Sequence, residues 1–231
     1  MPFDLICLDA DDTLWLHESF FQDAARRYHA LLAPFADSGH TERRLSEVED
    51  RNLQVYGYGV KGFTLSMLET ALEVAGDALP AETVRQILAL GRDLMQHPIH
   101  VMPGVKEALP RLAAHARLVL VTKGDLFHQE AKLAASGLGD CFAGVEIVSE
   151  KDEPTYRKVF ARYAVAPDRA VMVGNSLRSD VWPALAAGAW AVHIPHEFEW
   201  ARERAESPVN EARFVALGSF GQLPDWLERF A

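Results

Sequence analysis

The sequence has little cysteine, no long apolar run and no excess of basic residues. Only Cys7 and Cys141 occur in 231 residues, too few for a disulfide framework, so we expect both thiols to be reduced and buried. No uncharged apolar stretch approaches the roughly 20 residues of a membrane span. The first residues, MPFDLICLDADD, lack the basic start of a signal peptide. We therefore expect a cytoplasmic protein without a membrane partner.

Acidic side chains outnumber basic ones by 33 to 23, which gives a formal net charge of −10. A surface of that sign disfavours binding to a nucleic-acid polymer, which needs clustered lysine and arginine. A small anionic substrate remains compatible with it, because one local cation can reverse the field at a single site. The apolar share of 49% and the charged share of 24% are typical of a globular chain of one or two domains.

Short apolar runs alternate with helical patterns along much of the chain. The clearest runs are 3–8, 118–121 and 171–173, and weaker ones are 145–148 and 190–194. Continuous apolar runs of this length are typical of parallel strands that are covered on both faces. The helical patterns between them are 105–116, 127–136, 154–163 and 180–187. This alternation predicts a doubly wound, Rossmann-like parallel sheet of the α/β class.

The stretch 19–97 interrupts the alternation. It carries four helical patterns, 20–32, 41–55, 63–75 and 81–96, with a predicted turn at 38–40 before the second. Such a block is too long for a simple connection, so we expect an inserted α-helical domain. A loop at 56–62 contains three glycines, two tyrosines and Lys61. It either enters a substrate pocket or only turns the chain.

Three acids, Asp9, Asp11 and Asp12, directly follow the first predicted strand. Carboxylates so close together raise one another's pKa unless a bound cation offsets their charge. Mg²⁺ is the expected cation, because it is bound by carboxylate and phosphate oxygens. The same residues are also favoured helix N-caps. Because ligands in open α/β sheets bind at the carboxyl ends of the strands, we expect Thr122 and the loop 174–180 at the same place.

Four motifs, in order, resemble those of the haloacid dehalogenase superfamily. They are DADDTL at 9–14, an apolar strand that ends at Thr122, Lys151 before a predicted helix, and VGNSLRSD at 173–180. The resemblance spans about residues 3–195, and the helical block lies where that superfamily carries a C1 cap. It implies a core domain of residues 1–16 and 98–231 and a helical cap domain of residues 17–97.

The resemblance also implies a role for each matched residue. Asp9 is the expected nucleophile, which forms an aspartyl-phosphate, and Asp11 is the expected general acid and base. Thr122 is expected to bind phosphoryl oxygens. Lys151 is expected to neutralise charge on the nucleophile and the phosphoryl group. Lys123, next to Thr122, is a second candidate for binding the phosphoryl group.

The implied Mg²⁺ ligands are the side chains of Asp9 and Asp180 and the main-chain carbonyl of Asp11. The sequence departs from the family pattern at Asn175 and Asp12, where many members have aspartate and glycine. An amide at Asn175 can hold a metal-bound water or orient the lysine but adds no charge, and we include it in the expected metal site. We expect Asp12 to cap the turn that follows it.

Asp11 and the acid of the last motif, Asp180, favour phosphoryl transfer over dehalogenation. Dehalogenases of the superfamily have no acid at the position of Asp11, and they need no metal. The resemblance therefore implies a Mg²⁺-dependent phosphatase for a small phosphorylated metabolite, as a monomer or a homodimer. A nucleotidase, a phosphomutase or a phosphonatase with Lys61 as its cap lysine remains open. So does a binding protein without turnover, because fold does not prove function.

Several nearby residues match no motif. Trp15 and His17 are close enough in sequence to the nucleophile to contact substrate, or they pack at the hinge of the inserted domain. His193, His196 and Trp200 are expected to be surface and packing residues.

Overall fold

The computed structural model describes residues 3–230, which form two compact units. The first unit contains the chain up to Glu18, Ile99–Lys123 and the chain from Gln129 onward. The second unit contains Ser19–Pro98 and Gly124–His128. The junctions lie within two residues of the expected ones, but the short segment Gly124–His128, expected in the core, groups with the helical unit. Within residues 3–230, no helix is long and apolar enough to cross a membrane.

The first unit is built on a parallel sheet. Among the residues that the structure describes, six strands lie in the order β3-β2-β1-β4-β5-β6, and all neighbours pair in parallel. The strands are β1 (Leu5–Leu8), β2 (Arg117–Lys123), β3 (Gly144–Val148), β4 (Ala170–Gly174), β5 (Trp190–His193) and β6 (Phe214–Ala216). The order reverses beside β1, as in a doubly wound fold. The short edge strand β6 was not predicted.

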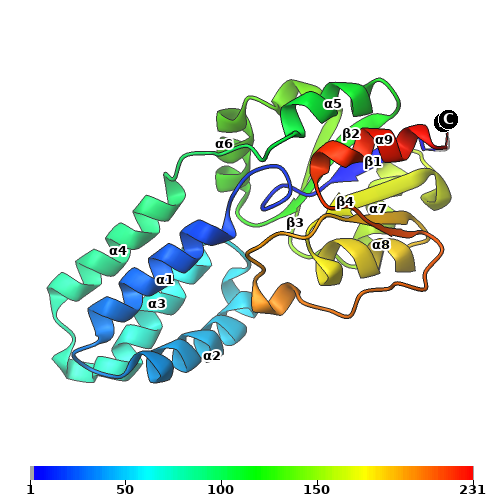
Figure 1. Ribbon diagram of the computed structural model, residues 1–231. Coiled ribbons are helices and arrows are strands. Elements are labelled where there is room, and N and C mark those ends of the chain that lie inside the picture. The colour runs from blue at the N-terminus through cyan, green and yellow to red at the C-terminus, as the bar shows by residue number, and fades with distance from the viewer. Residues whose placement is uncertain (1–2, 231) are drawn as a thin grey trace. The chain divides into compact units, whose positions relative to one another are not determined.

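Helices cover both faces of this sheet (Figure 1). They are α5 (Val105–Ala113), α6 (Leu126–Ser136), α7 (Glu153–Arg162), α8 (Trp182–Ala186) and α9 (Leu223–Glu228). Ile6 and Leu8 of β1 belong to the same apolar cluster as α5 and α9. Leu5 and Cys7, which point the other way, belong to the cluster of α7 and α8. Because both faces of β1 are buried, its sequence is apolar at every position.

The second unit is a bundle of four helices, α1 (Glu18–Leu32), α2 (Ser38–Tyr56), α3 (Val60–Ala75) and α4 (Ala81–Met95). Tyr28, Leu45, Met67 and Ile87 are among the buried residues of its core. Three of the helices begin earlier than predicted, α1 by two residues and α2 and α3 by three. The predicted turn 38–40 is the first turn of α2, because Asp37 caps that helix and accepts the N–H of His40 at 2.9 Å.

The predicted loop 56–62 is also shorter in the structure. Tyr56 ends α2 and Val60 begins α3, so Lys61 lies on a helix. Its ammonium group bonds Asp125 Oδ2 at 2.8 Å and lies over the ring of Phe127.

Both cysteines are free, as predicted. Cys7 is buried in the sheet, where desolvation raises the pKa of its thiol to about 12. Cys141 ends a short 3-10 turn and is only half-buried. The prediction that both thiols are buried was therefore wrong for Cys141.

Candidate active site

The carboxyl ends of β1, β2 and β4 bring four of the predicted residues to one edge of the sheet. Asp9 directly follows β1, Thr122 lies near the end of β2, Asn175 directly follows β4 and Asp180 lies just beyond it. Lys151 reaches the same place from the loop between β3 and α7. The doubly wound topology thus assembles residues that are far apart in the sequence.

Lys151 forms the centre of this arrangement. Its Nζ donates to Asp9 Oδ1 and, at 2.7 Å, to Asp180 Oδ1. The lysine side chain is 3% exposed, and those of Asp9 and Asp180 are 9% and 1% exposed. One buried cation therefore bridges two buried carboxylates.

The electrostatics of the bridge follow from this burial. Desolvation raises the pKa of Asp9 to about 7, although Lys151 opposes the shift. Desolvation also lowers the pKa of Lys151, but the charges of Asp180 and Asp9 more than offset it, so that this pKa lies above its usual value. The lysine is therefore charged, and Asp9 needs further positive charge to be fully ionised at neutral pH.

The backbone after β4 fixes Asp180. A single π-helical turn, Leu177–Val181, replaces the start of the predicted helix 180–187, and such turns are frequent at functional sites. The backbone N–H of Ser176 donates to Asp180 Oδ2 at 3.0 Å. A Cβ on Gly174 would lie 2.1 Å from that oxygen, so only glycine leaves room for the carboxylate.

Asp11 points to a separate set of donors. Trp15 Nε1 donates to its Oδ1 at 2.8 Å, and Gln129 Nε2 donates to its Oδ2 at 3.0 Å. Lys132 Nζ contacts both oxygens, at 2.6 and 2.7 Å, and His17 Nε2 lies 3.6 Å from Oδ2. Burial alone raises the pKa of Asp11, but His17, Lys132 and Gln129 outweigh it and hold the pKa well below its usual range. Asp11 is therefore ionised in this structure.

The amide of Asn175 lies beside the first strand. One of its terminal atoms is 3.2 Å from the main-chain oxygen of Asp11 and 3.3 Å from Asp9 Oδ2 and from Thr13 Oγ1. With nitrogen in that position the amide donates to these oxygens. With oxygen in that position, it lies beside a carboxylate, a main-chain and a hydroxyl oxygen, and oxygen donors of these types suit a hard cation such as Mg²⁺. The residues present thus fit Mg²⁺.

The other expected metal ligand, Asp180, is engaged differently, since its two oxygens accept from Lys151 and from Ser176 N–H. Each carboxylate oxygen has a second lone pair, so direct ligation by Asp180 is compatible with both bonds. Within residues 3–230, no three His, Cys, Asp or Glu side chains are grouped as a metal site. A cation here would therefore depend on the amide and the main-chain carbonyl as well as on Asp9.

Asp12 caps the following turn, as predicted. It accepts the backbone N–H of His17 at 2.8 Å and that of Glu18, the first residue of α1, at 2.9 Å. Its backbone has a φ of +58°, a conformation that glycine adopts more easily. Burial raises the pKa of Asp12 to about 6, and His196 lies 3.6 Å away.

The two remaining predicted residues have different surroundings. Thr122 is buried and its Oγ1 accepts from Gln129 Nε2 at 2.9 Å. Lys123 Nζ donates to Ser179 at 2.9 Å and to Glu203 Oε1 at 2.8 Å, and it lies 3.4 Å from Glu150. Carboxylates thus occupy Lys123 in this structure, and its predicted contact with phosphate stays a prediction.

Several residues of this region carry no motif that sequence reasoning could use. Gln129 and Lys132 are three residues apart on α6, so they share one helix face, and this spacing after Thr122 was the only available signal. His193 Nε2 lies 2.9 Å from the carbonyl oxygen of Asn175. Glu203 bonds Ser176 Oγ at 2.5 Å, from a segment with no recognisable pattern.

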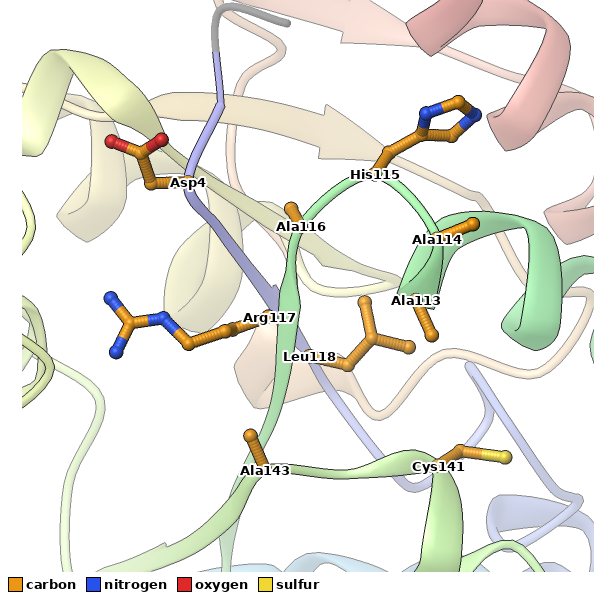
Figure 2. Close-up of a pocket in the computed structure, with 9 residues that line it drawn as sticks. All are labelled: Asp4, Ala113, Ala114, His115, Ala116, Arg117, Leu118, Cys141 and Ala143. Carbon is orange, nitrogen blue, oxygen red and sulfur yellow. The ribbon is translucent and has the colours of Figure 1, made fainter.

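A cavity of about 580 Å³ lies at the other end of the sheet, and Figure 2 shows the residues that line it. It lies by the start of β2, whereas Thr122 lies near the end of that strand. Its lining residues are Asp4, Ala113, Ala114, His115, Ala116, Arg117, Leu118, Cys141 and Ala143. Asp4 is paired there with Arg169, and Arg117 donates to the carbonyl of Tyr163 at 2.7 Å. The cavity lies apart from the acidic cluster and is not part of the candidate site.

The sequence of this chain matches a family model and a curated protein. The sequence model of the haloacid dehalogenase-like hydrolases matches residues 3–188. The chain is 28% identical over 225 residues to a phosphoserine phosphatase of Thermus thermophilus, with 82% of this chain and 88% of that protein covered.

Solved structures give the same result. A haloacid dehalogenase-like family hydrolase from Xanthomonas campestris has a TM-score of 0.89 and 40% identity, over 99% of this chain and 91% of that one. A 2-haloacid dehalogenase from Pseudomonas syringae pv. tomato has a TM-score of 0.67 and 21% identity, over 99% and 100% of the two chains, which is a likeness of fold alone. On the match over most of its length, this chain belongs to the haloacid dehalogenase-like hydrolases.

Proposed function

We propose that this hydrolase is a Mg²⁺-dependent phosphatase that acts on a small phosphorylated metabolite through an aspartyl-phosphate at Asp9. The observation that carries the proposal is a buried carboxylate, Asp9, held by Lys151, with a second acid two residues along the chain. The similarity to a phosphoserine phosphatase supports it. The helical unit would serve as the cap that selects the substrate.

In the first step, a carboxylate oxygen of Asp9 attacks phosphorus and the bond to the ester oxygen breaks. The leaving oxygen takes a proton from Asp11. Because Asp11 is ionised in this structure, it must first bind that proton, which the negative charge of an incoming phosphate favours. Lys151 lowers the repulsion between the carboxylate and the phosphate anion, because it lies within hydrogen-bond distance of Asp9. Thr122 would donate its hydroxyl to a phosphoryl oxygen.

In the second step, water attacks the phosphorus of the aspartyl-phosphate. The bond between phosphorus and Asp9 oxygen breaks, its electron pair returns to the carboxylate, and Asp11 takes the proton of water. The donors around Asp11 favour its ionised form, which is the form that this step needs. Over one cycle the proton given to the alcohol and the proton taken from water balance.

Mg²⁺ would be held by the side chain of Asp9, the main-chain carbonyl of Asp11 and the amide oxygen of Asn175. Its chemistry when bound is to neutralise charge on the phosphoryl group and on Asp9. The carboxylate of Asp180 would act chiefly through Lys151, which it holds at 2.7 Å. The same arrangement is compatible with a small soluble substrate and with either a monomer or a homodimer.

The phosphonatase alternative needs a neutral amine at Lys61 for a Schiff base. The ammonium of Lys61 is instead paired with Asp125 at 2.8 Å, and its side chain is 59% exposed. That pairing does not favour the alternative. A nucleotidase and a phosphomutase differ from the proposed enzyme in substrate and in the fate of the phosphoryl group, so a substrate panel separates them.

The test is phosphate release from a panel of phosphomonoesters, including phosphoserine and nucleotides, in Mg²⁺ and in EDTA. The wild type and Asp9→Asn are compared. We expect metal-dependent turnover that Asp9→Asn lowers at least about 1,000-fold, because the nucleophile is lost.

The matched control is Asp140→Asn, the same substitution at an exposed acid, which should leave turnover unchanged. Absence of turnover on every ester, from folded protein with Mg²⁺, would refute the proposal. Turnover that persists in Asp9→Asn would refute the role of this residue.

A further inference from the structure

A second buried lysine contacts the candidate site. Lys132 is 3% exposed, and its hydrogen bonds among the described residues both go to Asp11, at 2.6 and 2.7 Å. Lysine is almost never buried to this extent without a partner. The carboxylate of Asp11 is therefore fixed on both of its oxygens by one ammonium group.

Such a pair contributes little net stability, because removing two charges from water costs about as much as their attraction returns. What the pair does provide is one defined orientation of the carboxylate. Trp15 Nε1 adds a bond to Oδ1 at 2.8 Å, from an indole that is fully buried. Together these donors leave Asp11 little freedom to rotate.

The amide of Gln129 distinguishes the two oxygens of Asp11. Its Nε2 carries two hydrogens but has three acceptors, which are Asp11 Oδ2 at 3.0 Å, Thr122 Oγ1 at 2.9 Å and the carbonyl oxygen of Lys123 at 2.5 Å. The bond to Asp11 is the longest of the three. It can be given up while both amide hydrogens stay bonded, so Oδ2 is the oxygen that can be released for another donor.

We propose that Lys132 and Gln129 are positioning residues for Asp11, and that Asp11 Oδ2 is the atom that takes the proton of water when the aspartyl-phosphate is hydrolysed. This inference rests on the proposed phosphatase function. In that step the water oxygen forms a bond to phosphorus, and the bond between phosphorus and the Asp9 oxygen breaks. The proton of water binds Asp11 Oδ2 in place of the hydrogen bond from Gln129. Lys132 keeps the carboxylate aimed throughout.

The step can be isolated with p-nitrophenyl phosphate, whose leaving group departs without needing a proton. Lys132→Met should leave kcat/KM, which reports formation of the aspartyl-phosphate, within about threefold of the wild type. Its kcat should fall about 100-fold, the loss expected when a reacting group is misplaced, and KM should fall with it. A rapid burst of p-nitrophenolate, close to one per chain, should precede slow turnover.

Two further variants complete the design. Lys158→Met removes an exposed lysine of α7 in the same unit and should show neither burst nor loss of kcat. If Lys132→Met does not fold, Lys132→Gln takes its place, because it keeps a hydrogen-bond donor but no charge. It should likewise keep kcat/KM and lower kcat, by a smaller factor. When Lys132→Met is quenched with acid during turnover, mass spectrometry should detect one phosphoryl group on the protein.

The outcomes are distinguishable. If the wild type turns over but kcat and kcat/KM of the Lys132 variants fall equally, without a burst, these residues only support the fold and the inference is overturned. If the variants keep wild-type kcat, it is overturned as well. If the wild type hydrolyses no ester, the proposed function fails, and the inference fails with it.

Discussion

Replacing Asp9 with asparagine should stabilise the fold at alkaline pH while it removes turnover. Asp9 is a buried carboxylate, and desolvation raises its pKa to about 7. In the unfolded chain an aspartate has a pKa of about 3.9. Between these two values the native state holds a proton that the unfolded state has lost, so the free energy of unfolding falls as pH rises.

The magnitude follows from the difference in pKa. Each pKa unit corresponds to about 1.4 kcal/mol. The loss of unfolding free energy that Asp9 causes is therefore absent below about pH 4 and reaches about 4 kcal/mol above pH 7. Between pH 5 and pH 8 the deficit grows by about 3 kcal/mol. Asparagine has nearly the same shape and does not ionise, so the variant lacks this dependence. In a chain of this size, about 3 kcal/mol corresponds to about 6–12 °C in Tm.

The assay is thermal unfolding in EDTA at pH 5 and pH 8, for the wild type, Asp9→Asn and the exposed control Asp140→Asn. The gap in Tm between Asp9→Asn and the wild type should widen in favour of the variant at pH 8, and the control should follow the wild type. Parallel pH profiles for the variant and the wild type would refute the reasoning. Added Mg²⁺ should raise the Tm of the wild type at pH 8 more than that of Asp9→Asn, since a bound cation favours the ionised carboxylate.

Three other substitutions test the geometry. Gly174→Ala should lower the unfolding free energy by about 1–3 kcal/mol, measured with urea, because its Cβ would overlap Asp180; a neutral effect would contradict the packing. Lys123→Met should change KM for a phosphate ester less than about threefold, because the lysine is held by carboxylates; a rise in KM of about tenfold would restore its predicted contact with phosphate. Asn175→Asp should lower Tm in EDTA by like-charge repulsion with Asp9, yet bind Mg²⁺ more tightly by calorimetry, since it adds a charged ligand; unchanged affinity would place the metal elsewhere.

The elements with periodic patterns were predictable from the sequence. The strands β1, β2 and β4 are buried on both faces, so their apolar runs ended at the residues where the site begins. The four helices of the second unit were also predicted, with ends displaced by a few residues. Asp37 shows the reason for one displacement, because its side chain caps α2 while the Ser-Gly-His sequence after it favours a turn.

The residues that hold the predicted side chains could not be found in this way. Lys132 and Gln129 lie on a helix whose pattern is ordinary, and only the packing of α6 brings them to Asp11. Glu203 comes from a segment without apolar periodicity, yet it bonds Ser176 and Lys123. Contacts between segments so distant in sequence depend on tertiary packing, which local patterns do not encode.

The acid cluster shows how the fold resolves a difficulty that the sequence presents. Asp9, Asp11 and Asp12 lie within four residues and would repel one another, but each side chain has a different partner. Asp9 bonds Lys151, Asp11 bonds Lys132, and Asp12 accepts two backbone N–H groups. These partners reduce the repulsion among the three, although the charge of Asp11 still raises the pKa of Asp9 and of Asp12. The case for Mg²⁺ also rests on Asp9 Oδ2 and the main-chain oxygen of Asp11, which lie 3.3 and 3.2 Å from one terminal atom of the Asn175 amide. Substitution of that amide is the change that tests it most directly.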